Sequence, residues 1–106
     1  MLLEHYPVER LKREILDVIG RHLDLREYRV FFFGSRVTGR AVDRSDVDVG
    51  IEGTEEIPIS VMGMIRDEVA DLPTLYTVDV VDFKVVSEGF RRTALTSIEP
   101  IAPGAG

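Results

Sequence analysis

Two aspartates one residue apart, Asp46 and Asp48, are the side chains of this sequence best suited to chemistry. They alternate with aliphatic residues, and a period of two is typical of a half-buried strand. This alternation places both carboxylates on one face, while Val47, Val49 and Ile51 face the core. Because adjacent carboxylates repel each other, they favour a hard divalent cation with oxygen ligands, Mg²⁺ first.

A glycine–serine pair, Gly34 and Ser35, precedes Asp46 by ten intervening residues and follows the apolar run 30–33. Glycine permits a tight turn, and the backbone N–H groups and hydroxyl of such a turn suit phosphate oxygens. A strand, a Gly-Ser turn and a second strand with an Asp-x-Asp pair together predict a metal–nucleotide site.

Three arginines, Arg36, Arg40 and Arg44, lie between the turn and the acid pair. Their placement favours binding of a small triphosphate over binding of a polymer. The alternative is that they are solvated loop residues and that Arg36 only forms a surface salt bridge.

A third carboxylate is needed, because two-metal transfer chemistry holds its ions roughly 3.5–4 Å apart with ligands from more than one strand. Asp79 and Asp82 are the candidates, and their spacing of three turns them to opposite faces of a strand. We favour Asp79, which has a valine on either side, and interpret Asp82 as a capping or surface residue. The alternative for Asp46 and Asp48 is a solvated strand face, with Asp46 capping a turn.

Periodicity predicts an α/β fold, a small mixed β-sheet flanked by helices, in one domain over residues 1–106. His22, Met62 and Met64 are interpreted as packing residues, and Phe90 and Leu95 as turned inward. The expected helices cover 8–23, 58–72 and 87–96, the last capped by Ser87, with a helical turn over 35–38 that starts on the Ser35 hydroxyl and ends at Gly39. The expected strands cover 28–33, 47–52 and 75–83. A frayed tail is expected to begin at residue 100 or 101 and to run to 106.

Composition excludes several classes of function. The formal net charge of −6 is unfavourable for general binding of a nucleic-acid polymer. The absence of cysteine excludes thiolate metal sites and disulfides and makes the cytoplasm the expected location. No apolar run approaches the roughly 18 residues that a membrane span requires.

The pattern Gly34-Ser35, ten residues, Asp46-x-Asp48 resembles the signature of the DNA polymerase β-type nucleotidyltransferase superfamily. The wording Gly-Ser-Arg…Gly…Ser-Asp-Val-Asp is most similar to its minimal nucleotidyltransferase (MNT) branch, and the run 78–82 fits the third-carboxylate strand of that superfamily. Proteins of this branch are commonly the antitoxin of a two-protein module whose other half is a HEPN-domain ribonuclease.

The resemblance implies an enzyme that uses two Mg²⁺ ions to move AMP from ATP to a hydroxyl of a partner protein. That partner would be the HEPN toxin, in a hetero-oligomer. The alternatives are a non-catalytic antitoxin or binding module of the same fold, and a nucleotidyltransferase that acts on a small molecule. The implied catalytic and metal residues are Asp46, Asp48 and Asp79, and the implied nucleotide-binding residues are Gly34, Ser35 and Arg36.

Overall fold

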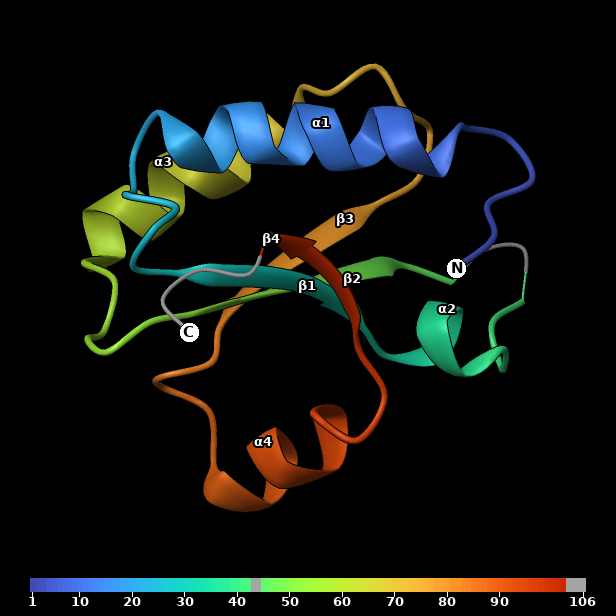
Figure 1. Cartoon of the computed structure of the whole chain (residues 1–106). Coiled ribbons are helices and arrows are strands. Elements are labelled where there is room, and N and C mark those ends of the chain that lie inside the picture. The colour runs from blue at the N-terminus through green and yellow to red at the C-terminus, as the bar shows by residue number, and fades with distance from the viewer. Residues whose placement is uncertain (43–44, 103–106) are drawn as a thin grey trace.

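A four-stranded mixed sheet forms the centre of the computed structural model, which describes residues 1–42 and 45–102 (Figure 1). The strand order is β3-β2-β1-β4, with β1 antiparallel to β2 and β4, and β3 parallel to β2. The elements are α1 Val8–Gly20, β1 Arg29–Phe33, α2 Ser35–Thr38, β2 Val47–Glu52, α3 Ile59–Ala70, β3 Val78–Asp82, α4 Glu88–Ala94 and β4 Glu99–Ala102. The predicted small mixed sheet flanked by helices is therefore confirmed.

Helices α1 and α3 lie over one face of the sheet, and α4 lies over the other (Figure 1). The first face holds the larger core, because the apolar stripe of α1 meets the aliphatic side of β2 there. Fully buried members of this core include Leu11, Ile15, Ile19, Val47, Val49, Ile51 and Ile65.

In the described part of the chain, no helix combines the length and apolar character that crossing a membrane would need.

The second face is built around three phenylalanines, Phe31, Phe33 and Phe83. The ring centroids of Phe31 and Phe83 lie 4.9 Å apart in an edge-to-face arrangement. A Cβ on Gly50 would overlap both of these rings, so glycine is required at the centre of β2 for the aromatic cluster to close. The cluster supports α4 above the sheet.

Helix α1 ends three residues before the predicted boundary at Leu23. The N–H groups of Arg21 and His22 bond to carbonyls three residues back, Val18 (3.2 Å) and Ile19 (3.0 Å). Such bonds tighten a last turn and end the helix. His22 is largely buried as predicted, but its Nε2 also lies 2.6 Å from Oε2 of Glu68, which links α1 to α3.

Strand β4 corrects the prediction of a frayed tail from Pro100. Glu99–Ala102 pairs with β1 and forms an edge of the sheet. Proline is tolerated on an edge strand because its missing N–H faces away from the ladder. The Glu99 carboxylate binds the Met1 ammonium group and lies 3.1 Å from the Lys12 ammonium. The rest of that tail, residues 103–106, lies outside the described residues.

One of the two methionines that the sequence analysis interprets as packing residues is exposed instead. Met62 is buried, but Met64 is 46% exposed, because the first faces the sheet and the second faces solvent on α3. The third strand begins at Val78 instead of Leu75, and Leu75 is fully exposed in the connection before it. Helix α3 likewise begins at Ile59, with Pro58 as its N-cap.

Candidate active site

Asp48 lies in β2 on the face opposite α1 and α3, as the alternation predicts. Its neighbours Val47 and Val49 are fully buried, whereas Asp48 is half-buried. Asp46 is exposed and lies one residue before the strand begins. The acid pair is therefore one strand residue and one residue of the preceding connection.

Asp79 is the exact register partner of Asp48 in the parallel β2–β3 ladder. Partners in a parallel pair point to the same face, so these two carboxylates are neighbours. Asp82 pairs with Ile51 and shares the core face. It is buried, and its two carboxylate oxygens accept hydrogen bonds from the N–H groups of Ile57 (2.8 Å) and Lys84 (2.9 Å). The predicted capping role is confirmed, and the predicted surface position is wrong.

The surroundings of Asp48 disfavour its ionised form. Burial raises the pKa of Asp48, and the negative charges of Asp79 and Asp46 raise that pKa further. Within residues 1–42 and 45–102, the carboxylates of Asp46, Asp48 and Asp79 accept no hydrogen bond and form no ion pair. This set of hard oxygen donors with excess negative charge has the chemistry that a divalent cation requires. No three acidic or histidine side chains of those same residues already form a group able to hold a metal ion.

Gly34 joins the end of β1 to α2 and lies directly against Asp48. Its φ of 81° is a left-handed value that favours glycine. A Cβ at this position would overlap Oδ2 of Asp48, so the contact of the turn with the carboxylate also requires glycine. Gly34, and not the Ser35 hydroxyl, is the N-cap of α2, and the helix has no side-chain cap. Gly39, with φ 79°, ends the helix as predicted.

Arg36 reaches across to the segment that precedes Asp46. Its Nε and Nη2 donate hydrogen bonds to the Ser45 carbonyl at 3.2 and 2.9 Å. The guanidinium carbon lies 4.9 Å from the centroid of the Tyr76 ring, a cation–π contact. These contacts join α2 to the start of β2 and to the connection before β3. They hold the backbone directly before Asp46, and the sequence did not indicate these contacts of Arg36.

A pocket of about 820 Å³ extends from the Gly34 turn to α4. Asp48 of β2 and Gly34 of the turn contribute to its lining, and Phe90 and Thr93 contribute from α4. Arg40 also lines it, which agrees with the expected positive charge near the site; Arg44 lies outside the described residues. The sequence predicted α4 from its Ser87 cap, and Ser87 Oγ accepts a hydrogen bond from the Phe90 N–H at 3.1 Å. Nothing in the sequence placed this helix beside Asp48.

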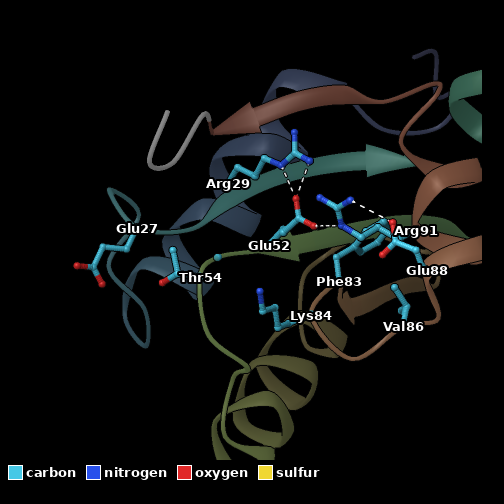
Figure 2. Close-up of a pocket in the computed structure, with 10 residues that line it drawn as sticks. Glu27, Arg29, Glu52, Thr54, Phe83, Lys84, Val86, Glu88 and Arg91 are labelled. Atoms are coloured by element: carbon cyan, nitrogen blue, oxygen red, sulfur yellow. Dashed lines mark hydrogen bonds and ion pairs between the residues drawn. The ribbon is translucent and has the colours of Figure 1, made fainter.

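A second carboxylate on the same face of β2, Glu52, lies in different surroundings (Figure 2). Its Oε1 accepts hydrogen bonds from Arg29 Nε and Nη2 at 3.0 and 2.6 Å, and its Oε2 accepts one from Arg91 Nε at 2.5 Å. Burial opposes ionisation, but the bonds from Arg91 and Arg29 prevail and lower the pKa of Glu52. The pocket of about 500 Å³ beside this cluster is lined by both signs of charge.

Comparison with known proteins places the chain among nucleotidyltransferases. The family model described as "Polymerase beta, Nucleotidyltransferase" matches residues 28–102, a range that contains every predicted site residue. A Haemophilus influenzae protein described as "Probable protein adenylyltransferase MntA" is 32% identical over 83 residues, covering 76% of this chain and 73% of that protein.

Two solved structures have a similar fold. A toxin–antitoxin complex with AMP-PNP matches with a TM-score of 0.71 and 17% identity, covering 89% of this chain and 73% of that chain. A tri-AMPylated Shewanella oneidensis HEPN toxin in complex with MNT antitoxin matches with a TM-score of 0.69 and 14% identity, covering 92% and 72%. These structures support the fold, and the family model with the Haemophilus relative shows that the chain belongs to the polymerase β nucleotidyltransferase family.

Proposed function

We propose that this protein is a Mg²⁺-dependent nucleotidyltransferase that moves AMP from ATP to a hydroxyl group of a partner protein. The observation that carries the proposal is the contact of Asp48 with the Gly34 turn, with Asp79 beside it in register. A carboxylate suited to a cation thus meets a turn suited to phosphate, and both line one pocket. Membership of the family supports the class of reaction.

The donor set fits Mg²⁺, because Asp46, Asp48 and Asp79 offer only carboxylate oxygens and have no cationic partner in the described residues. Two bound ions would neutralise the triphosphate and the charge that develops at the attacked phosphorus. Asp46 and Asp48 would hold both ions, and Asp79 would complete the one nearer the acceptor. Gly34 and Ser35 would hold the β- and γ-phosphates, with Arg36 a third predicted contact.

The reaction joins the acceptor oxygen to the α-phosphorus of ATP. The bond from that phosphorus to the bridging oxygen of the β-phosphate breaks, and pyrophosphate leaves in line. Asp79 is exposed at an edge strand and can take the acceptor's proton. The remaining contribution of the protein is positioning and electrostatics, which dominate phosphoryl-transfer catalysis.

A HEPN ribonuclease toxin is the partner that we propose, and this protein is its antitoxin. Support comes from the similar fold of an MNT antitoxin that was solved with a tri-AMPylated HEPN toxin. A net charge of −6 would also steer the protein toward a basic, RNA-binding partner. The product would be a hetero-oligomer in which AMP on the toxin blocks its access to RNA.

The test is co-expression with the protein that the neighbouring gene encodes, followed by incubation of the purified pair with ATP and Mg²⁺. Intact-mass measurement should show the toxin gaining one or more AMP groups. Asp48→Asn should abolish the gain, whereas Asp67→Asn, at an exposed aspartate of α3, should leave it unchanged. A stable complex without any AMP would favour the non-catalytic antitoxin, and no complex would favour the small-molecule substrate.

A further inference from the structure

Phe90 differs from the other large apolar side chains that the described residues expose. Those others are aliphatic: Leu2, Val42, Ile59, Met64, Leu75 and Val85. Phe90 alone among them is aromatic, is 46% exposed, and lines the pocket that also contains Gly34 and Asp48. An aromatic ring left half open inside a pocket, instead of on a convex surface, points to a ligand with a flat apolar group.

The Phe90 ring is held in place from below. Its centroid lies 6.0 Å from that of Phe33, edge-on at 88°, and 5.9 Å from that of Phe83. Both of these rings are themselves buried in the aromatic cluster. The Phe90 backbone is also fixed, because its N–H donates to the hydroxyl of the Ser87 cap. The Phe90 side chain is therefore ordered before any ligand binds. A group that stacks on its exposed face then costs little side-chain entropy.

The pocket has the size and polarity of a nucleotide site. Its volume of about 820 Å³ falls within the roughly 300–1,000 Å³ of small-molecule sites. The Gly34 and Asp48 side is suited to phosphates and cations, whereas the Phe90 side offers an aromatic face with the hydroxyls of Thr93 and Ser97 nearby. One molecule with an anionic end and a flat aromatic end matches both sides.

We propose that Phe90 is the platform on which the base of the bound nucleotide stacks. This inference rests on the proposed function and assigns the base to α4, while the triphosphate occupies the Gly34 turn. Every nucleobase presents a π face, so the platform supplies affinity for nucleosides in general. Choice among bases belongs to the polar groups around the ring.

The decisive experiment compares two ligands, ATP and inorganic triphosphate, by calorimetry in the presence of Mg²⁺. Phe90→Ala should weaken ATP binding about tenfold to a hundredfold, the range of base–aromatic stacking. It should leave triphosphate binding unchanged, because that ligand has no base. Phe90→Leu keeps apolar volume under α4 but removes the π face, and should lose ATP affinity in the same way. Phe90→Trp keeps an aromatic face and should retain the ATP affinity.

Val85→Ala, at an exposed apolar residue outside this pocket, is the matched control and should bind both ligands normally. Equal weakening of ATP and triphosphate by Phe90→Leu would overturn the platform and assign Phe90 a purely structural role. Unchanged ATP binding in both Phe90→Ala and Phe90→Leu would overturn it as well. If the unaltered protein binds neither ligand, the proposed function fails and the platform fails with it.

Discussion

Asp48 and Glu52 lie four residues apart on the same face of β2 and have opposite electrostatic surroundings. Glu52 accepts hydrogen bonds from Arg29 and Arg91, and these bonds lower its pKa against the effect of burial. Burial raises the pKa of Asp48, and its charged neighbours, Asp79 and Asp46, raise it further. One end of the strand is therefore neutralised within the protein, and the other is left with unbalanced negative charge.

The difference favours a structural role for Glu52 and is consistent with the proposed functional role of Asp48. The Glu52 carboxylate forms ion pairs with Arg29 at the start of β1 and with Arg91 of α4, so its charge stabilises the packing of these elements on β2. Asp48 contributes nothing comparable to stability, because a partly buried anion among anions destabilises the folded state. A charge of that kind is consistent with a ligand that completes the site, and clusters of perturbed carboxylates are common at functional sites.

The largest expected effect is on catalysis at the Asp48 end. Asp48→Asn should lower AMP transfer by roughly 10³-fold or more, since a bound metal ion contributes several kcal/mol to the transition state. The same change should raise the thermal midpoint of the metal-free protein, because it removes a disfavoured charge. Transfer is measured by the mass of the acceptor, and midpoints by circular dichroism. Substantial transfer by the variant would remove Asp48 from the active site.

Glu52→Gln should have the converse effect. It weakens three charge-assisted hydrogen bonds at a side chain only 13% exposed, and should lower the free energy of unfolding by about 1–3 kcal/mol. The rate of AMP transfer by the folded variant should stay within about twofold of the wild-type rate. A group distant from the site is expected to change the activation free energy by ~0.4 kcal/mol at most. Urea denaturation measures the first quantity. Glu55→Gln, at an exposed glutamate of the loop after β2, is the control.

A smaller effect is expected at the contact that supports Asp46. Tyr76→Leu removes the ring beneath the Arg36 guanidinium and should lower kcat about 2- to 10-fold, the range of a cation–π contact. The KM for ATP should change little, because the change acts on the placement of Asp46. Tyr76→Phe keeps the ring and should retain the rate. A loss of equal size in Tyr76→Phe would show that the ring contact is not responsible.

The smallest effect is the pH dependence of stability in metal-free protein. The pKa of Asp48 is raised in the folded state, so its unfavourable contribution is present at neutral pH and disappears as pH falls through that raised pKa. The pKa of Glu52 is lowered, so its favourable contribution is present above the ordinary glutamate pKa and disappears as pH falls through the lowered value. Thermal midpoints of wild type, Asp48→Asn and Glu52→Gln across acidic pH measure both differences. Parallel curves for all three proteins would contradict the electrostatic contrast.

The sequence was sufficient for the acidic strand because local periodicity determines it. Alternation from Asp46 to Ile51 indicates which side chains share a face, and the spacing of Asp79 and Asp82 indicates that only one of them can lie beside Asp48. The register that pairs Asp48 with Asp79 is a tertiary property. It agrees with the choice of Asp79, and its catalytic role stays a prediction.

The parts that the sequence did not reveal depend on contacts distant in the chain. Glu99–Ala102 is short and contains Pro100, so nothing local predicts that it pairs with β1. Phe90 was expected to be turned inward, but it is half exposed because Phe31, Phe33 and Phe83 already fill the space beneath it. The contact of Arg36 with the Ser45 carbonyl likewise depends on the position of Ser45 relative to α2, which the residue types do not specify.

The central claim is that the Asp48 end of β2 is the ligand site and that the Glu52 end is structural. It is tested most directly by the stabilisation that Mg²⁺–ATP gives to wild type, Asp48→Asn and Glu52→Gln in thermal denaturation. A ligand at 100 times its Kd stabilises a protein by about 2.7 kcal/mol. The account predicts equal upward shifts of Tm for wild type and Glu52→Gln and almost none for Asp48→Asn. A full shift in Asp48→Asn, or a shift lost only in Glu52→Gln, would contradict it.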